Sequence, residues 1–289
     1  MTRSKISFFD ALNYTLLVLI CMIMIYPFLN VASVSLSSYN AYVNNPVMIW
    51  PKEFTLSAYK QIIGHGMLWR SYANTIVVTV SGVAIGILIY ILTAYSLSKK
   101  VLRGRSTLMV LIVFTMLFNG GLIPNYYLMR SLGLIDSLAA LVLPALVSGF
   151  NLILMKNFFE SLPEEIEEAA KIDGASDPYI LFRIVVPLSK PIIATLCLFA
   201  AVAYWNNFFN AIIYIRSSEN WPLMLYLREV IEGASAMAQN ANSAELDELM
   251  TSETIKYATL MLVMVPILLV YPFLQKYFVK GIMLGSVKG

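Results

Sequence analysis

Six long windows of this 289-residue chain contain no Asp, Glu, Lys or Arg. A helix that crosses the roughly 30 Å hydrocarbon core of a bilayer needs about 20 consecutive apolar residues, because each residue adds only about 1.5 Å to its length. The windows run over Ala11–Pro51, Ser71–Ser98, Ser106–Met129, Ser137–Met155, Pro191–Ile215 and Tyr257–Gln275. We therefore expect an all-α membrane protein with six transmembrane helices.

The composition indicates that lipid is the main solvent of this chain. Apolar residues make up 59% of it and charged residues 13%, which leaves too little polar surface for a water-soluble globule. No repeat of fixed period divides the sequence, so we expect a single domain over 1–289. We place the spans at about 11–34, 72–97, 107–128, 137–156, 191–215 and 257–275. The other segments are exterior stretches at 35–70 and 216–256, a cytoplasmic loop at 157–190 and a C-terminal tail at 278–289.

The distribution of Lys and Arg orients the spans. With the amino terminus inside, the inner segments carry thirteen of the 20 basic residues and the outer segments seven, and basic residues favour the cytoplasmic side. We therefore expect both termini in the cytoplasm. A secretory signal is the alternative for the amino terminus, but the apolar run of about two dozen residues exceeds the roughly 7–15 residues of a signal peptide's apolar region.

The densest charge on the inner side lies in the loop between the fourth and fifth spans. Ser161 and Glu164 have the S-x-x-E spacing of a capping box, and four glutamates crowd positions 164–168, where the positive end of a helix dipole favours them. A short helix is expected to begin there. Its small apolar face would consist of Ile166, Ala169 and Ala170.

The helix is expected to end at Gly174, because glycine suits the left-handed conformation of a C-cap. Asp177-Pro178 then predicts the start of a second helix, and Pro187 predicts its end. Such a helical hairpin between spans is either an amphipathic element on the membrane surface or a docking site for a soluble protein. The residues alone favour the membrane surface.

The segment from Glu168 to Pro187 reads E-A-A-x3-G-x9-I-x-V-P. It is similar to the EAA motif, the signature of membrane subunits of binding-protein-dependent ABC importers, except that Val186 stands where the motif usually has Leu. Further stretches narrow the resemblance to the smaller six-span subunit of carbohydrate importers of the maltose-type group. They are AYSLSKK (94–100), LIPNYYLMRSLGLIDS (122–137), FFESLPEEIEEAAKIDGAS (158–176), YWNNFF (204–209) and FVKGIMLGSVKG (278–289).

This resemblance implies a type I ABC importer permease fold with a coupling helix in the cytoplasmic hairpin. In that family the coupling helix sits in a cleft of an ATPase subunit and transmits its closure to the spans. The residues assigned to this ATPase-coupling role are Glu164, Glu165, Glu168, Ala169, Ala170, Asp173, Gly174, Ala175 and Pro187. The resemblance also implies that the tail reaches between two ATPase subunits, whereas composition alone predicts a frayed end. The long exterior segment before the sixth span resembles the branch that imports larger oligosaccharides.

The implied partners are a second, homologous permease subunit in a heterodimer, two cytoplasmic ATP-binding subunits, an extracytoplasmic sugar-binding protein and membrane lipid, with no nucleic acid. The sequence has no G-x-x-x-x-G-K-[ST] phosphate loop. We therefore expect ATP and Mg²⁺ on the partner subunits, and no cofactor or metal on this chain. The implied location is the bacterial inner membrane, and the implied function is import of a sugar or oligosaccharide by alternating access.

A polar run in the fifth span, YWNNFFN, supplies amides and aromatic rings at membrane depth, as passage of a sugar requires. Asn206 and Asn210 are four residues apart and would share one helix face, with Asn207 pointing elsewhere. The candidate substrate pathway consists of Asn119, Trp205, Asn206 and Asn210. Hydrogen bonding between helices is the alternative role for these amides.

A polytopic membrane enzyme acting on a glycan or lipid is the alternative from another class. It would need acidic or histidine residues gathered at one membrane face, and the dense inner cluster at 164–168 is already explained by a helix start. An ion-driven carrier is disfavoured because the six windows lack the buried charges that such carriers need. We therefore expect a transport subunit that is not itself an enzyme.

Overall fold

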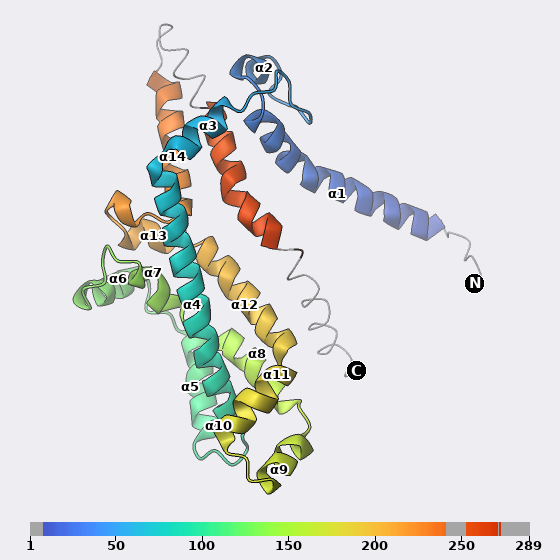
Figure 1. Ribbon diagram of the computed structural model, residues 1–289, viewed down its shortest axis with the longest axis vertical. Helices are drawn as coiled ribbons and strands as arrows, with labels where there is room; N and C mark the ends of the chain where they lie inside the picture. The colour runs from blue at the N-terminus through green and yellow to red at the C-terminus, as the bar shows by residue number, and fades with distance from the viewer. Residues whose placement is uncertain (1–7, 241–252, 271, 273–289) are drawn as a thin grey trace. The chain divides into compact units, whose positions relative to one another are not determined.

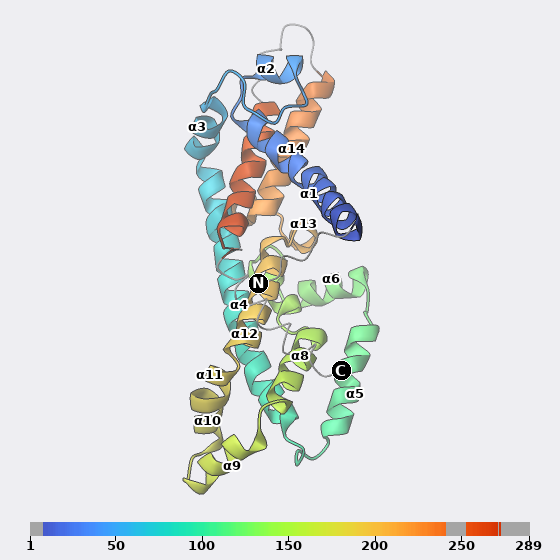
Figure 2. The same ribbon diagram turned by 90° about the vertical axis from the view of Figure 1, so that its right-hand side faces the viewer.

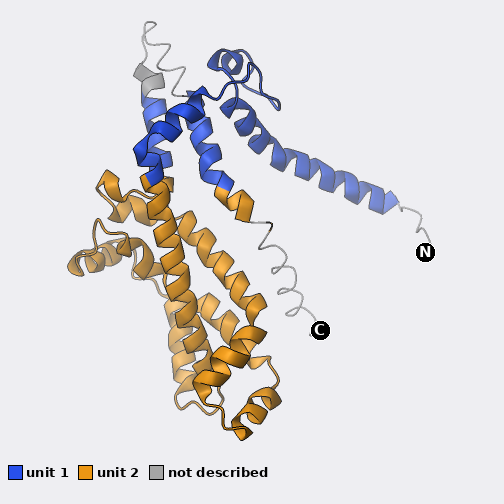
Figure 3. Ribbon diagram, viewed as in Figure 1, with its two compact units in different colours: residues 1–69, 226–265 blue, residues 70–225, 266–289 orange. Residues whose placement is uncertain are grey.

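A computed structural model describes residues 8–240, 253–270 and 272 of the chain. Within these residues every regular element is helical, and strand-like pairing is limited to an isolated bridge between Ser37 and Phe54. The chain divides into two compact units, residues 1–69 with 226–265 and residues 70–225 with 266–289 (Figure 3). The tail at 278–289 and the end of the expected sixth span lie outside the described residues.

The helices follow one another as labelled in Figure 1. They are α1 Phe8–Ser35, α2 Tyr39–Asn44, α3 Ser57–Gly64, α4 Gly66–Ser98, α5 Arg105–Leu117, α6 Leu122–Ser131, α7 Ala139–Val142, α8 Gly149–Glu160, α9 Glu164–Ile172, α10 Asp177–Ile180, α11 Val186–Leu188, α12 Lys190–Trp205, α13 Phe209–Tyr214 and α14 Leu223–Asn240. Short 3-10 turns cover Leu143–Ala145 and Ser218–Asn220, and a π-helical segment, Leu181–Val185, joins α10 to α11. A further helix covers Glu253–Val270.

Three helices, α1, α4 and Glu253–Val270, are each long and apolar enough to cross a membrane. Three further candidates are pairs of helices bent at a short break. The bends are 111° between α5 and α6, 52° between α7 with its 3-10 turn and α8, and 80° between the α10–α11 segment and α12. Counted as one span each, the pairs bring the candidate spans among the described residues to six. The helix expected over 107–128 thus ends at Leu117.

In the second unit, α4 packs closely against its neighbours because two of its residues have no side chain. Gly82 lies against the ring of Tyr204 in α12, and a Cβ atom at Gly86 would lie 3.0 Å from the backbone oxygen of Leu146. Their spacing of four residues places both glycines on one face of the helix. Small residues at this spacing let helices approach closely within membranes.

The C-terminal half of α4 contributes to a cluster of buried apolar side chains. Side chains of α8, α10, the π-helical segment and α12 complete this cluster. Its buried members include Ala94, Met155, Ile180 and Leu196. Helix α9 lies at the same end of this unit as the turn between α4 and α5 (Figures 1 and 2). The hairpin that contains α9 is therefore built on a packed core.

In the first unit, polar contacts fold the stretch that follows α1, which was predicted to be exterior. The side-chain amide of Asn30 donates to the backbone oxygens of Pro46 and Met48, at 3.2 and 3.1 Å. The hydroxyl oxygens of Tyr42 and Tyr257 lie 3.4 Å apart, and this hydrogen bond raises the pKa of Tyr42 to about 12. This stretch is a folded element of its unit.

Candidate functional site

Helix α9 begins without the capping box that the sequence suggested. Its N-cap is Pro163, which makes no side-chain cap, and Ser161 belongs to the end of α8, where its hydroxyl donates to the backbone oxygen of Phe158 at 2.7 Å. The prediction was wrong because Pro163 occupies the N-cap position. Three glutamates in the first turn stabilise the helix start instead, at the positive end of its dipole.

The end of α9 is a Schellman turn. Gly174 has a φ of +80° and donates to the backbone oxygen of Lys171 at 3.0 Å, while Ala175 donates to that of Ala170 at 3.0 Å. Ala170 and Ala175 both pack against the buried cluster at the end of α4. The left-handed cap predicted at Gly174 is confirmed, and these two alanines fix the end of the helix against the core.

Helix α9 has an inner and an outer face. Glu167 and Ala170 are half-buried, whereas Ile166, Ala169 and Ile172 are exposed, Ile172 by 86%. The predicted apolar face of Ile166, Ala169 and Ala170 is therefore divided between the two sides. Exposed carboxylates without an ion-pair partner among the described residues flank the outer face: Glu165, Glu168 and Asp173. We call Ile166, Ala169 and Ile172 the outer strip.

An ion pair attaches the inner face of α9 to the end of α4. The ammonium of Lys99 contacts the carboxylate of Glu167, and the two side chains are only 27% and 19% exposed. The hydroxyl of Tyr95 donates to the same carboxylate at 3.5 Å, and the Lys99 nitrogen lies 4.2 Å from the centroid of the Tyr95 ring. Removing one partner of a half-buried pair leaves the other charge uncompensated, so breaking this contact costs more than breaking an exposed ion pair.

Further ion pairs join the same end of the unit. Lys100 and Glu164 lie 2.6 Å apart, and their hydrogen bond raises the pKa of Lys100 and lowers that of Glu164. Glu160 accepts from Arg105 and, at 2.7 Å, from Lys156. The turn between α4 and α5, the end of α8 and the start of α9 are therefore joined by charge as well as by packing.

The second helix of the hairpin begins at Asp177 and ends within one residue of the predicted stop at Pro187. It continues to Leu188, because the preceding π-helical segment widens the turn, with the Val186 amide bonded to the Leu181 carbonyl. A widened turn gives the proline ring room that an α-helical turn lacks. The 80° bend into α12 follows directly.

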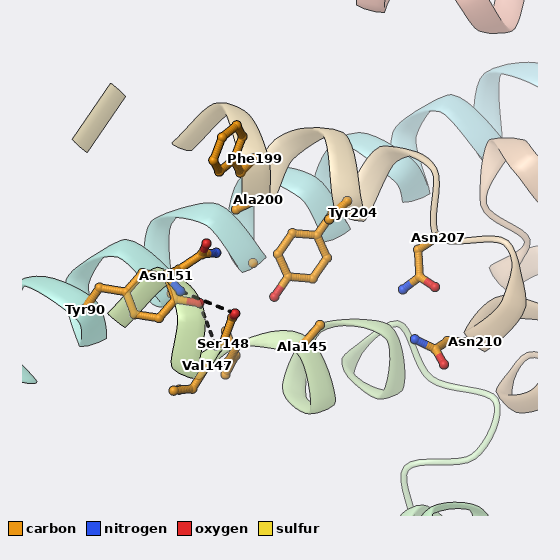
Figure 4. Close-up of a pocket in the computed structure, with 14 residues that line it drawn as sticks. Tyr90, Ala145, Val147, Ser148, Asn151, Phe199, Ala200, Tyr204, Asn207 and Asn210 are labelled. Atoms are coloured by element: carbon orange, nitrogen blue, oxygen red, sulfur yellow. Dashed lines mark hydrogen bonds between the residues drawn. The ribbon is translucent and has the colours of Figure 1, made fainter. Parts of the chain in front are cut away.

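A cavity of about 390 Å³ lies between α4, the break before α8, and α12 with α13 (Figure 4). The polar side chains that line it belong to Tyr90, Ser148, Asn151, Tyr204, Asn207 and Asn210. Figure 4 shows Tyr204 between Asn207 and Asn210 on one side and Tyr90 and Asn151 on the other. No charged side chain is among the described residues that line the cavity. Its surface therefore offers amides and hydroxyls to a solute.

Of the four predicted pathway residues, Asn206 lies in the break between α12 and α13, and Asn210 lies in the first turn of α13. Because α12 ends at Trp205 and α13 begins at Phe209, Asn206 and Asn210 do not share a helix face, and that prediction was wrong. Asn210 lines the cavity. Asn206 does not, and its amide donates to the backbone oxygen of Val202 at 2.9 Å.

The other two predicted pathway residues do not line the cavity. Asn119 lies in the break between α5 and α6, where its side-chain oxygen accepts from the Gly121 amide at 3.0 Å. The ring of Trp205 meets that of Tyr72 edge-on, with centroids 6.4 Å apart. The buried indole N–H of Trp205 has no acceptor among the described residues.

Glu167 and Tyr204, which the sequence analysis assigned to no site, are central to this geometry. So is Asn207, which was predicted to point away from the pathway but lines the cavity with Asn210. The Tyr204 hydroxyl donates to the backbone oxygen of Val142 at 3.2 Å, and the Asn207 amide donates to that of Leu141 at 3.5 Å. Glu167 could have been found from helical spacing, because it lies three residues before an alanine of the inner face. No local pattern distinguishes the other two.

Asp136 fastens the turn between α6 and α7 to the segment after α13. One of its carboxylate oxygens accepts from the backbone amides of Ser217 and Arg216, at 2.9 and 3.0 Å, and from the Ser217 hydroxyl at 2.9 Å. These hydrogen bonds stabilise the charged form and lower the pKa of Asp136. The carboxylate thus joins two segments that are far apart in the sequence.

The described part of the chain contains no group of three or more His, Cys, Asp or Glu side chains that could hold a metal ion. The amides and phenols of the cavity suit hydrogen bonding to a solute rather than metal ligation.

Residues 100–284 match the family of binding-protein-dependent transport system inner membrane components. The chain belongs to this family. Among its relatives, the polygalacturonan/rhamnogalacturonan transport system permease protein YtcP of Bacillus subtilis is 43% identical over 281 residues, which cover 97% of this chain and 98% of that protein. The arabinooligosaccharides transport system permease protein AraQ of Halalkalibacterium halodurans is 27% identical, with 93% of each chain covered.

A solved structure shares the fold of this permease. It is a bacterial ABC transporter involved in the import of the acidic polysaccharide alginate, and one of its chains matches with a TM-score of 0.85 and 38% identity. The match covers 93% of this chain and 96% of that one. The ABC importer permease fold predicted from the EAA motif is confirmed. Family membership makes the chain a transport subunit and excludes the membrane enzyme that was the alternative.

Proposed function

We propose that this permease carries an oligosaccharide that contains acidic sugar residues into the cytoplasm by alternating access. The choice of cargo rests on two similar proteins. The relative at 43% identity is named for polygalacturonan and rhamnogalacturonan, and the solved neighbour at 38% identity is involved in alginate import. All three polysaccharides contain uronic acids. The acidic cargo of these proteins supports the same class here.

The proposed assembly is a heterodimer of this chain with a second permease subunit, two cytoplasmic ATP-binding subunits and an extracytoplasmic sugar-binding protein. ATP and Mg²⁺ bind to the ATP-binding subunits in this proposal. Both termini of this chain are cytoplasmic, in agreement with the excess of basic residues on that side. The tail at 278–289 reaches between the ATP-binding subunits.

In the proposed mechanism, α9 inserts into a cleft of an ATP-binding subunit. The outer strip supports this role, because exposed aliphatic side chains on a charged helix are favourable where a protein partner covers them. The opposite face of α9 is attached to α4 through Lys99 and Glu167. Closure of the ATP-binding subunits would therefore move α9 and α4 together, and with them the wall of the cavity that contains Gly82, Gly86 and Tyr90.

The cavity forms part of the proposed substrate pathway. Of the four residues predicted from the sequence, Asn210 lines it, and Asn207 joins it there. Amide groups and the phenol rings of Tyr90 and Tyr204 are suited to sugar hydroxyls and to the apolar faces of sugar rings. We therefore propose that the substrate pathway includes Tyr90, Tyr204, Asn207 and Asn210.

Reconstitution in proteoliposomes tests the proposal. The permease pair, the ATP-binding subunits and the sugar-binding protein would be combined, and ATP-driven uptake of labelled trigalacturonate would be compared with that of maltotriose. We expect uptake of trigalacturonate that requires both ATP and the binding protein. Uptake of maltotriose alone would contradict the acidic cargo while leaving the importer intact. Failure of α9 variants to change assembly with the ATP-binding subunits would contradict the coupling role.

A further inference from the structure

A second hollow, of about 650 Å³, opens beside the end of α4, between the turn at 101–104 and the α10–π segment. Its apolar lining consists of Leu92, Val101, Leu102, Leu181 and Phe182, with Tyr95 and Pro178 beside them. Leu92 and Phe182 are 45% and 48% exposed, so the described residues do not cover this apolar surface.

Three basic side chains border the hollow: Lys99, Arg103 and Lys171. Two of them form ion pairs: Lys99 with Glu167, and Lys171 with Asp177 at 3.6 Å. Asp177 is the one carboxylate among the described residues of the lining. Arg103 is exposed and has no carboxylate partner in the described parts of the chain. Its guanidinium is therefore available to an anion from outside the chain.

The hollow crosses the boundary between the apolar and charged parts of α4. Leu92 lies within the charge-free window, whereas Lys99 is the first charged residue after it. In the proposed orientation this boundary is the cytoplasmic surface of the bilayer, where anionic headgroups meet basic side chains and acyl chains meet the apolar side chains of the spans. A ligand that fills the hollow has an anionic head and a hydrocarbon tail.

We propose that this hollow binds an anionic phospholipid, with the headgroup phosphate on Arg103 and the start of an acyl chain on Leu92, Leu181 and Phe182. A guanidinium recognises a phosphate through paired N–H donors, which favours arginine over lysine at such a position. The lipid would lie directly beside the Lys99–Glu167 contact between α4 and α9. The proposal rests on the membrane orientation given above, and goes beyond the import function.

Native mass spectrometry of the complete transporter in detergent tests this site. The complex would be titrated with palmitoyl-oleoyl-phosphatidylglycerol or with the matching phosphatidylcholine, and retained lipid counted. We expect Arg103→Gln to weaken retention of phosphatidylglycerol about fivefold, the effect of about one basic residue at an anionic surface. Arg183→Gln is the matched control, because Arg183 is exposed on the adjacent π segment but does not line the hollow. Its retention should equal that of the wild type.

Further measurements separate the sources of phosphate and the kinds of partner. Inorganic phosphate at equal concentration should not displace the lipid, because it cannot occupy the apolar half of the hollow; displacement would overturn the proposal. Equal retention by the Arg103→Gln and Arg183→Gln complexes would also overturn it. So would a loss of ATP-binding subunits in Arg103→Gln with lipid retention unchanged, which would make the hollow a protein-docking surface.

Phe182→Ala tests the apolar half of the hollow, where the acyl chain is proposed to lie. It should also weaken retention of phosphatidylglycerol, and unchanged retention would contradict the proposal.

Discussion

Lys99, which follows α4, is paired with Glu167 in the middle of α9, although 68 residues separate them. Tyr95 contacts both side chains, one turn earlier on α4. The contact joins the proposed docking helix to a helix that also lines the cavity. In the proposed mechanism, this contact would pass a displacement of α9 to α4.

Reversing either charge of this pair should uncouple ATP hydrolysis from uptake. Lys99→Glu and Glu167→Lys each bring like charges together in a half-buried place, and we expect uptake per ATP to fall about fivefold or more. The double exchange restores opposite charges and should recover most of the loss. Lys190→Glu is the control, since Lys190 is exposed and has no ion-pair partner among the described residues. A double variant no better than the single ones would contradict the proposed link.

Gly174 should tolerate no side chain without loss of coupling. At its φ of +80°, Gly174→Ala adds about 1–2 kcal/mol of backbone strain. Gly174→Asp adds less strain, because Asp adopts this conformation more readily, but it adds a negative charge next to Asp173 on the proposed docking surface. Membrane insertion should stay normal, whereas sugar-stimulated uptake falls. Gly64→Ala is the matched control, because Gly64 has no positive φ and no atom within 4 Å of an added Cβ. Normal uptake by Gly174→Asp would argue against the docking role of this hairpin.

Gly82→Ala should destabilise the permease although alanine favours helices. The added methyl group meets the Tyr204 ring, and overpacking of this kind costs about 1–3 kcal/mol. We expect a lower Tm in detergent and partial recovery when Tyr204→Leu is added. Gly233→Ala, in an open position of α14, should leave Tm unchanged or raise it. A wild-type Tm for Gly82→Ala would show that α4 and α12 pack more loosely than described.

Asp136 should make thermal stability depend on pH. The pKa of its carboxyl is lower in the folded protein than in the unfolded chain, where it is about 3.9, so its contribution is complete above that value and is lost as the pH falls through the folded pKa. Asp136→Asn should therefore lower Tm at pH 7, and the difference from the wild type should shrink below about pH 4. A difference that stays constant across this range would assign the effect to geometry rather than charge.

Truncating the cavity amides should weaken handling of the cargo. Asn207→Ala and Asn210→Ala each remove hydrogen-bonding groups from the lining, and we expect the KM for uptake to rise about three- to tenfold, as loss of a typical hydrogen bond predicts. Asn206→Ala should have a smaller effect, because that side chain bonds to its own helix. Equal effects at all three positions would indicate that the cargo path does not follow this cavity.

The features of the hairpin that could be predicted are those fixed by neighbouring residues. A positive φ at Gly174 and negative charge at the start of α9 follow from local chemistry. The inner face could not be predicted as readily, because Ala169 and Ala170 are adjacent and equally apolar. The position of α4 decides that Ala170 is covered and Ala169 is exposed.

The breaks within the apolar windows were not predictable from composition. No charged residue interrupts 117–122 or 205–209, so the search for charge-free windows passed over both breaks. Asn119-Gly120-Gly121 is a local turn signal for the first break, whereas the two asparagines at 206–207 give no comparable signal for the second. In the second case the contacts of the break lie elsewhere in the chain, with Asn207 bonded to the backbone of Leu141 and Tyr204 to that of Val142. The polar cavity depends on these distant partners, which is why only one of its residues was foreseen.

The cavity presents only neutral groups among its described lining residues, and for the acidic cargo that we propose this bears on where selection would take place. The described lining offers no positively charged side chain that would attract a polyanion passing through the cavity. Under the proposed function, we expect discrimination between acidic and neutral glycans at the binding protein that delivers the cargo. Exchanging that binding protein would redirect the importer to another glycan while this chain stayed as it is.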